Sequence, residues 1–412
     1  MLCVIGQALN EQEGPAAMSQ VWIPARFYRG GTSKGVFFHG RDLPADREAC
    51  SQLLLAVLGS PDANGRQLDG MGGGISSLSK AVIIGPSSRA DADVDYTFVQ
   101  LAVDKPVADW TSNCGNLTSA VGPFAVDEGV VRVRDGEALV RIHQTNTRKV
   151  IHARFPVEGG RARVDGDFAI AGVAGTGARI RLDFLDPGGA GTGRLLPTGN
   201  AVDRIEVPDA GTFDVSVVDA TTVVAYVKAE DVGLEGTETP EEIEVRPAVM
   251  ALLDRIRRRV GVVIGLADRA EKVPLQSPRI AVVSRPARFK SLDGTVHEAG
   301  SHDLATRMLS MERAHRAIMG TGALNIGVAS RIEGTIPHAL TRRTGPPDET
   351  RVGNPSGLVS VGAEVRRAGN GWAVDSAVLF RTARRLMQGE VAVPMRLAGL
   401  AKDRAREGAA TA

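Results

Sequence analysis

The chain has 412 residues, and its 49 lysines and arginines are balanced by 48 aspartates and glutamates, which leaves a formal net charge of +1. This balance excludes the basic surface of a nucleic-acid-binding protein and any electrostatic attraction to an anionic membrane. Hydrophobic residues make up 43% of the chain, aromatic residues only 4%, and 48 residues are glycine. We therefore expect two domains of mixed helices and strands joined by tight turns.

The start of the chain and the cysteines indicate the compartment. Residues 1–17 have no basic stretch and carry two glutamates, so they do not fit a signal peptide, and we expect a disordered extension. No apolar run reaches the roughly 18 residues that cross a membrane. Cys3, Cys50 and Cys114 are too far apart for a disulfide framework or a cysteine metal site. We expect a cytoplasmic protein in which Cys50 is a buried helix thiol.

Runs of β-branched residues bounded by Gly, Pro and Asp alternate with helical patterns in each half. The predicted strands of the first half are 81–84, 97–103, 138–144 and 153–157. Apolar periodicity predicts helices over 46–59 and 240–261, the second kinked at Pro247. The residues after Cys114 are small or apolar on every side, which predicts a buried helix.

Three segments of the first half resemble three segments of the second half, in the same order. They are 32–43 with 222–233, 77–87 with 276–286, and 113–129 with 318–334. The second pair places Lys80 over Arg279, and the third pair places Cys114 over Met319. Three matches in one order predict a duplicated domain, with the glycine-rich segment 185–200 as the passage between the halves.

Two similar tetrapeptides lead into the predicted buried helices, Asn113-Cys114-Gly115-Asn116 and Met319-Gly320-Thr321-Gly322. A helix start presents free N–H groups and the positive end of the helix dipole, which attract a carboxylate, and glycine lets a ligand approach the backbone. We therefore expect two half-sites that each hold one carboxylate of a di- or tricarboxylic acid. Cys114 is either a reactive thiolate or acid favoured by the dipole or a small core residue, and the residues alone leave both open.

Two basic residues occupy matching positions in the repeat. Lys80 enters the apolar run 81–84, where it is either a residue whose amine reaches the surface or a desolvated amine that can act as a base. Arg279 cannot act as a base, but its guanidinium can hold a carboxylate with two hydrogen bonds.

Three other patterns carry no assigned chemistry. Segment 29–35 lacks the spacing of a phosphate-binding loop. His297 and His302 are one residue too far apart for a zinc-binding helix motif, and Gly300 lies between them. His143 is expected to be a strand histidine with satisfied hydrogen bonds rather than a residue of the cleft.

Several motifs, in sequence order, resemble the methylaconitate cis–trans isomerase family of the diaminopimelate epimerase-like superfamily. They are YRGGTSKGVFFHGRDLP, DGMGGGISSLSKAVII, DWTSNCGNLTSAVGPFA, LLPTGN, MGTGALNIGVASRIEGT and NPSG, and the resemblance runs from about residue 22 to about residue 396. It implies an α/β (α+β) fold of two duplicated domains, each a curved β-sheet or barrel around a central helix, with the active site in the interdomain cleft. The implied domains are 18–190, completed by 385–400, and 191–384, followed by a tail at 401–412.

The resemblance also implies roles for individual residues. Racemising members of the superfamily use two facing cysteines as bases, whereas this chain has Cys114 and, opposite it, a methionine. In the isomerases the acid–base pair matches Lys80 and Cys114. The substrate contacts that the resemblance implies are Thr32, Ser33, Asn113, Gly115, Asn116, Arg279, Met319, Gly320, Thr321 and Ser356.

The implied reaction is allylic proton transfer on an unsaturated carboxylate, with no metal and no organic cofactor. We expect a 2-methylaconitate cis–trans isomerase of propionate catabolism through the methylcitrate cycle, with Lys80 as the base. The alternatives are a 4-oxalomesaconate tautomerase or 1,3-allylic isomerase, a methylitaconate Δ-isomerase, and a non-catalytic carboxylate-binding protein. The expected partner is a small-molecule tricarboxylate, without nucleic acid or membrane, and a homodimer is left open.

Overall fold

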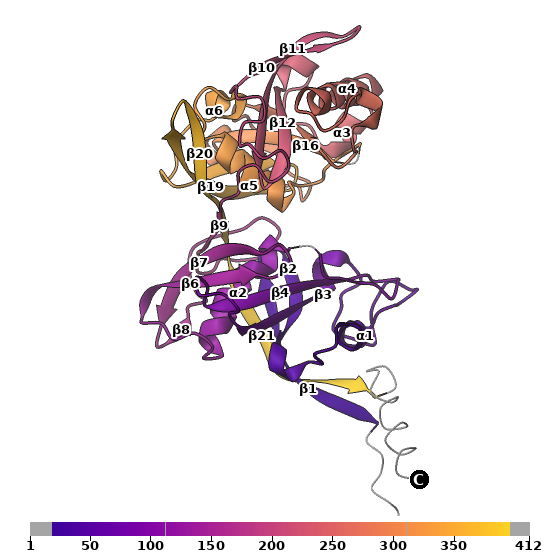
Figure 1. Ribbon diagram of the computed structural model, residues 1–412, viewed down its shortest axis with the longest axis vertical. Coiled ribbons are helices and arrows are strands. Elements are labelled where there is room, and N and C mark those ends of the chain that lie inside the picture. The colour runs from indigo at the N-terminus through magenta and orange to yellow at the C-terminus, as the bar shows by residue number, and fades with distance from the viewer. Residues whose placement is uncertain (1–18, 112, 311, 396–412) are drawn as a thin grey trace, which may run out of the picture.

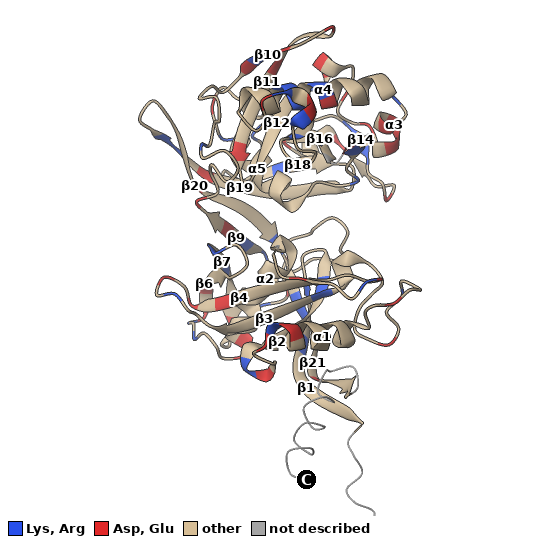
Figure 2. Ribbon diagram, turned by 45° about the vertical axis from the view of Figure 1, so that its right-hand side comes forward, with Lys and Arg blue, Asp and Glu red and all other residues tan. Residues whose placement is uncertain are grey.

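The computed structural model describes residues 19–111, 113–310 and 312–395. The expected extension at 1–17, the expected tail at 401–412 and Cys3 lie outside these residues. Figure 1 shows two lobes joined by a narrow waist. Acidic and basic residues are interspersed over both lobes (Figure 2), in keeping with the near-zero net charge.

The lower lobe contains the first half of the chain and its last strand (Figure 1). Its strands are β1 (Gln20–Gly30), β2 (Ser33–His39), β3 (Lys80–Pro86), β4 (Val94–Leu101), β5 (Ala108–Asp109), β6 (Gly136–Gln144), β7 (Lys149–Glu158), β8 (Arg161–Ala162), β9 (Ile180–Leu185) and β21 (Ala383–Pro394). Its helices are α1 (Arg47–Leu58) and α2 (Gly115–Asp127), with 3-10 turns η1 (Gly40–Asp42) and η2 (Ser76–Leu78).

The upper lobe contains the rest of the described chain (Figure 1). Its strands are β10 (Asp203–Val207), β11 (Gly211–Ala220), β12 (Thr222–Lys228), β13 (Arg279–Ser284), β14 (Phe289–Lys290), β15 (Val296–His297), β16 (Leu304–Ser310), β17 (Arg313–Ala314), β18 (Thr350–Asn354), β19 (Gly357–Ala368) and β20 (Gly371–Arg381). Its helices are α3 (Pro240–Glu244), α4 (Pro247–Val263), α5 (Gly320–Ala329) and α6 (Ile336–Leu340), with 3-10 turns η3 (Glu230–Val232), η4 (Ala270–Lys272) and η5 (Ala299–Ser301).

The order of strand pairings in the lower lobe recurs in the upper lobe. In the lower lobe β1–β2 is antiparallel, β2–β3 parallel, β3–β4 antiparallel, β4–β6 parallel and β6–β7 antiparallel. The pairs β11–β12, β12–β13, β13–β16, β16–β18 and β18–β19 follow the same sequence of directions. Lys80 and Arg279 each begin a matching strand, and Gly115 and Gly320 each begin a matching helix.

Each lobe is built around one buried helix. Every residue of α2 from Leu117 to Val126 is buried, and α2 contacts strands β1, β2, β6, β7, β9 and β21. In the upper lobe α5 is buried from Gly322 to Ala329 and contacts β11, β12, β19 and β20. Small and apolar residues on all sides allow this arrangement, because such a helix has no polar face to present to water. The predicted buried helix after Cys114 is confirmed.

Two strands near the end of the chain join the lobes. Strand β20 pairs with β19 of the upper lobe, and its last residues pair with β9 of the lower lobe, from Ser376↔Leu185 to Arg381↔Ile180. Strand β21 then runs antiparallel to β1, from Ala383↔Gly30 to Pro394↔Gln20. The sheet is therefore continuous across the waist, and Arg381 is the last residue of the strand that crosses it.

The predicted strands and the helix at 46–59 agree with the structure, but the helix predicted over 240–261 does not. Two helices occupy that segment, and Pro247 is the first residue of α4 rather than a kink within one helix. Proline lacks the N–H that an interior helical position needs, whereas the first turn leaves this N–H unpaired in any case. Cys50 is a buried thiol of α1 as predicted, and burial raises its pKa to about 11. Among the described residues, no helix combines the length and the hydropathy that crossing a membrane requires.

One buried histidine of the upper lobe makes stability depend on pH. His302 is 0% exposed and its Nε2 has no hydrogen-bond partner. Burial lowers the pKa of His302 from 6.5 to about 4, because the imidazolium loses its hydration in the core. The unfolded chain therefore takes up a proton at this position at a higher pH than the folded chain does.

We predict that lowering the pH from about 7.5 to about 5 costs the wild type about 2 kcal/mol of unfolding free energy through His302. This contribution is fully present above the ordinary pKa and is lost as the pH falls toward about 4. Urea denaturation of the wild type and of His302→Gln at both pH values measures it. Equal acid losses in the two proteins would contradict the assignment.

Candidate active site

Cys114 stands at the start of the buried helix α2. It is the N-cap residue, its backbone is extended, and its side chain makes no capping hydrogen bond. Thr118 donates to the Cys114 carbonyl oxygen through both its backbone N–H (3.0 Å) and its hydroxyl (2.9 Å). The thiol, in a residue that is 9% exposed, is thus free to interact with a ligand at the end of the helix where N–H groups lack intrahelical partners.

The neighbouring β1–β2 hairpin explains why the chain has three glycines at Gly30, Gly31 and Gly35. A Cβ on Gly30 would lie 2.6 Å from the Asn116 carbonyl oxygen, and a Cβ on Gly31 would lie 2.3 Å from Asn116 Oδ1. Gly31 also has a positive φ of 52°. These glycines let the first turn of α2 contact the hairpin backbone directly. This close packing is the role of segment 29–35, which lacks the spacing of a phosphate-binding loop.

Asn116 connects this hairpin to the waist of the molecule. Its Nδ2 donates to Thr32 Oγ1 at 3.1 Å and to Ser33 Oγ at 3.5 Å, and its Oδ1 accepts from Arg381 Nε at 3.0 Å. The structure thus brings Thr32, Ser33 and Asn116 together, and it adds an arginine that the sequence analysis did not select. Asn113 is nearby through its Oδ1, which accepts from the Thr118 hydroxyl at 3.4 Å.

Lys80 begins β3 in the interior of the lower lobe rather than at its surface. It is 8% exposed, and its Nζ donates to Gln100 Oε1 at 2.5 Å and lies 5.1 Å from the centroid of the Phe98 ring. Gln100 is held in turn, because its Nε2 donates to backbone carbonyl oxygens including that of Ser79 (3.0 Å). The environment of Lys80 is therefore an amide and an aromatic ring.

Gly35 lies between Lys80 and α2. A Cβ at this position would lie 2.8 Å from the Lys80 carbonyl oxygen and 2.8 Å from Leu117 Cδ1. The start of β3 and the first turn of α2 thus both pack closely against one glycine. This close packing fixes Lys80 relative to Cys114, although Lys80 Nζ bonds to Gln100 and not to the thiol.

The matching positions of the upper lobe have similar geometry. Met319 is the N-cap residue of α5, as Cys114 is of α2. Arg279 Nη1 donates to Thr321 Oγ1 at 3.1 Å, its Nε is buried without a partner, and burial lowers its pKa. The backbone of Thr321 is held by Thr221, whose hydroxyl donates to the Thr321 carbonyl oxygen at 2.9 Å.

The glycines that begin the two helices differ in their surroundings. A Cβ on Gly115 would meet Leu379 at 3.6 Å, an ordinary contact, whereas a Cβ on Gly320 would meet nothing within 4 Å. The backbone at Gly320 therefore faces open space, which a ligand could occupy.

Residues of both lobes line a cavity of about 650 Å³. From the lower lobe come Thr32 and the loop 168–173, from the upper lobe come Ile318 and Ser356, and Arg381 comes from the end of β20, the strand that crosses between the lobes. Two lining residues, Thr32 and Arg381, are bonded to Asn116 in the first turn of α2, and a third, Ile318, directly precedes the N-cap residue of α5. The Ser356 hydroxyl donates to the Arg316 carbonyl oxygen at 2.6 Å, which holds this side chain in place at the cavity.

Of the predicted residues, Thr32 and Ser356 line this cavity directly. Ser33, Asn113, Cys114 and Asn116 belong to the contacts around the start of α2, and Gly115 is the first residue of that helix. Met319, Gly320, Thr321 and Arg279 form the corresponding group at α5.

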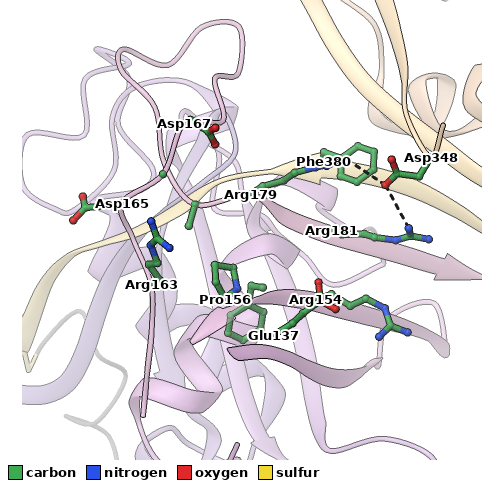
Figure 3. Close-up of a pocket in the computed structure, with 13 residues that line it drawn as sticks. Glu137, Arg154, Pro156, Arg163, Asp165, Asp167, Arg179, Arg181, Asp348 and Phe380 are labelled. Carbon is green, nitrogen blue, oxygen red and sulfur yellow. Dashed lines mark hydrogen bonds and ion pairs between the residues drawn. The ribbon is translucent and has the colours of Figure 1, made fainter. Parts of the chain in front are cut away.

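A second cavity, of about 620 Å³, lies on the lower lobe near the waist (Figure 3). Arginines and acidic residues line it together, and Arg179 and Arg181 lie 3.4 Å and 3.8 Å from Asp348 of the upper lobe. Arg179 also stacks on Phe380, the residue before Arg381, with 3.8 Å between guanidinium carbon and ring centroid. These ion pairs join the lobes, and because acidic residues accompany the arginines of the lining, this cavity is a poor site for a polyanion.

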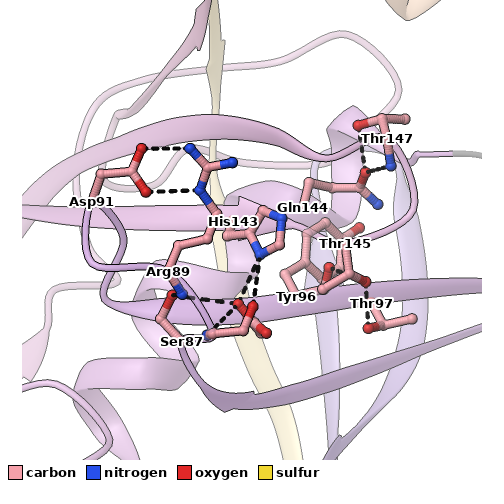
Figure 4. A network of polar contacts seen from close by, with 11 residues as sticks. Ser87, Arg89, Asp91, Tyr96, Thr97, His143, Gln144, Thr145 and Thr147 are labelled. Atoms are coloured by element: carbon pink, nitrogen blue, oxygen red, sulfur yellow. Dashed lines mark hydrogen bonds and ion pairs between the residues drawn. The ribbon is translucent and has the colours of Figure 1, made fainter.

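His143 is a strand histidine with satisfied hydrogen bonds, as predicted (Figure 4). Its Nδ1 lies 2.9 Å from Asp95 Oδ1 and 3.4 Å from Ser88 Oγ. Because the acid and the hydroxyl meet the same ring nitrogen, the three groups cannot relay a proton from serine through histidine to aspartate. Among the described residues, no cluster of His, Cys, Asp and Glu has the arrangement of a metal site.

Sequence reasoning did not select Arg381 or His297, both of which line the cavity. Arg381 ends an apolar strand, as Lys80 begins one, and this was the available signal. The sequence could not reveal that the strand crosses between the lobes and ends at α2. His297 was considered only as a metal ligand, whereas its ring stacks on Phe289 with 4.8 Å between centroids.

The fold and this site define a mixed α/β protein with a cavity lined by residues of two similarly paired lobes. The model of the PrpF protein family matches residues 20–394, so the chain belongs to the PrpF family, and the resemblance seen in the sequence is confirmed.

Named relatives of the chain are isomerases. The 3-methylitaconate isomerase of Eubacterium barkeri is 42% identical over 379 residues, which cover 91% of this chain and 98% of that protein. The 2-methyl-aconitate isomerase of Shewanella oneidensis is 40% identical over 388 residues, with 91% and 98% covered. A crystal structure of methylitaconate-delta-isomerase has a TM-score of 0.84 at 41% identity and covers 92% of this chain and 98% of that chain. The protein is therefore an isomerase of the PrpF family.

We predict that Gly35→Ala lowers the free energy of unfolding by about 1–3 kcal/mol, because the new methyl group has no room between Lys80 and Leu117. Gly40→Ala is the matched control, since the nearest atom to its Cβ would be at 3.6 Å. We expect it to be neutral or stabilising by up to about 1 kcal/mol. Urea denaturation compares the two, and equal stabilities would contradict the close packing of α2 against the hairpin.

Proposed function

We propose that this protein isomerises unsaturated di- and tricarboxylic acids by allylic proton transfer, and that cis–trans isomerisation of 2-methylaconitate is its reaction. The observation that carries the proposal is the setting of Lys80. Its amine lies inside the lower lobe, bonded to the neutral amide of Gln100. Among the described residues no carboxylate forms an ion pair with Lys80, so the amine is available to a substrate.

We infer that the two lobes arose by duplication and that the substrate binds between them. The inferred domains are 18–190, completed by 385–400, and 191–384, on a diaminopimelate epimerase-like fold. The repeated order of strand pairings supports the duplication, and the cavity lined by both lobes supports the location.

In the proposed mechanism Lys80 removes a proton from the CH₂ group between a carboxylate and the C=C bond. The C–H electron pair spreads into the diene carboxylate, so that the former double bond gains single-bond character and can rotate. The proton then returns to the same carbon, from Lys80 or from Cys114, and gives the other geometric isomer. Return at another carbon would instead move the double bond.

The groups around the two helix starts would stabilise the anionic intermediate. Backbone N–H groups at Gly115 and Gly320 point from the positive ends of α2 and α5. Arg279, Thr321 and Ser356 would hold a carboxylate in the upper lobe. In the lower lobe Asn113, Asn116, Thr32 and Ser33 form a neutral polar surface beside Cys114, and Met319 would supply an apolar contact opposite.

A second candidate is the isomerisation of methylitaconate, in which the proton returns at a different carbon. The identity and coverage of the Eubacterium barkeri relative favour it. The chemistry at Lys80 and Cys114 would be the same, so the two candidates differ only in how the cavity accommodates the substrate. A non-catalytic carboxylate-binding protein would need neither residue.

We predict that Lys80→Ala lowers turnover of 2-methylaconitate by roughly 10²–10⁴-fold, because the loss removes a general base from its place beside the substrate. Cys114→Ser should lower it as well, and Lys105→Ala, which changes an exposed lysine of the same lobe, should leave it unchanged. Proton NMR of the substrate and product signals follows the reaction. Full activity of Lys80→Ala would reject the proton-transfer mechanism.

A panel of three substrates separates the candidates. We predict that kcat/KM is highest for 2-methylaconitate, lower for methylitaconate and lower still for 4-oxalomesaconate. A preference for one of the other two would transfer the assignment to that substrate without changing the mechanism. Binding of all three without turnover would favour the non-catalytic alternative.

A further inference from the structure

Arg381 reaches the candidate site from an element that belongs to both lobes. It is the last residue of β20, it pairs with Ile180 of β9, and its side chain lines the cavity beside Thr32. The strand that crosses the waist therefore places the Arg381 guanidinium group at the start of α2.

The hydrogen bonds of Arg381 hold the side chain without neutralising its charge. Its Nε donates to Asn116 Oδ1 at 3.0 Å, and its Nη1 donates to the Phe380 carbonyl oxygen at 2.9 Å. Both acceptors are neutral. In the part of the chain that the structure describes, no carboxylate lies within ion-pair distance of Arg381, whereas Arg179, which directly precedes β9, and Arg181 on β9 are each paired with acidic residues of the upper lobe.

The hydrogen bond to Asn116 places Arg381 at the first turn of α2, the helix that Cys114 caps. Burial lowers the pKa of Arg381 to about 10, and the negative charge of an ionised Cys114 acts in the opposite direction. The guanidinium therefore stays protonated at neutral pH and acts on Cys114 through space. A partly buried charge without a counter-charge is unfavourable, so an anion in the cavity would be bound favourably there.

We propose that Arg381 binds a carboxylate of the substrate beside Cys114, through the guanidinium N–H groups that Asn116 and Phe380 leave free. This inference rests on the proposed function and adds to it a cation beside the start of α2. Under the proposed function, Arg279 already holds a carboxylate of the substrate in the upper lobe. One arginine at each helix start would hold the two ends of a di- or tricarboxylate, with the reacting carbons between them.

Iodoacetate tests the inference, because it is a small carboxylate that alkylates thiols, and iodoacetamide is its neutral counterpart. If Arg381 binds the carboxylate, iodoacetate should modify Cys114 faster than iodoacetamide does, and its rate should saturate with concentration. Peptide mapping by mass spectrometry reads the modification at Cys114 separately from the other cysteines. The experiment needs no knowledge of the physiological substrate.

We predict that Arg381→Gln lowers the iodoacetate-to-iodoacetamide rate ratio by roughly ten- to a hundred-fold, the effect of losing a hydrogen bond to a charged group. Arg381→Lys should give a rate ratio between those of the wild type and Arg381→Gln, because lysine keeps the charge and lacks the planar guanidinium group. Arg366→Gln is the matched control, since this arginine of β19 has a side chain that is 60% exposed and pairs only with Asp375. Thermal unfolding confirms that each variant is folded.

An unchanged ratio in a folded Arg381→Gln protein, or a Cys114 that neither reagent modifies in the wild type, would overturn the inference. The outcome is separate from that of the proposed function. If Arg381→Gln lowers the rate ratio but the wild type is inactive on every unsaturated carboxylate, the proposed function is rejected. Arg381 then remains a carboxylate-binding residue. With an active enzyme, Arg381→Gln should raise KM for the substrate by a similar factor.

Discussion

The first turn of α2 packs directly on the backbone of the β1–β2 hairpin, and the rest of the site depends on this contact. Gly30, Gly31 and Gly35 remove the side chains that would otherwise separate the two elements. Because the helix is buried along its length, it cannot move away without opening the core of the lower lobe. Cys114 at its start and Lys80 behind the hairpin are therefore held at fixed relative positions.

The cations of the candidate site share a property that sets them apart from other basic residues. Lys80, Arg279 and Arg381 are each held by an amide or a hydroxyl group. Elsewhere the arginines are commonly paired with acids, as Arg141 is with Asp93 at 2.6 Å. Neutral partners fix the position of a cation and leave its charge for an incoming anion. An anionic substrate would thus complete the electrostatics of the site, and no second charged group of the protein would have to be displaced.

Much of the site could be predicted from local sequence. The repeat aligned Lys80 with Arg279 and Cys114 with Met319, and these residues begin matching strands and cap matching helices. Such positions can be predicted because glycine and apolar periodicity mark the boundaries of helices and strands. The role of Arg381 could not be predicted from local sequence, because it follows from the pairing of β20 with β9, a contact between distant parts of the chain. The break at Pro247 was misjudged, since proline at a first helical position and proline at a kink give similar patterns.

In the proposed mechanism a proton leaves the CH₂ group of the substrate during isomerisation, and proton NMR of 2-methylaconitate incubated with the enzyme in D₂O shows whether it does. A protonated lysine carries three hydrogens that exchange with solvent, so the hydrogen that returns to carbon should mostly be deuterium. We expect deuterium to enter the CH₂ position as the cis and trans isomers interconvert. Interconversion with no deuterium at that carbon would contradict proton transfer by Lys80.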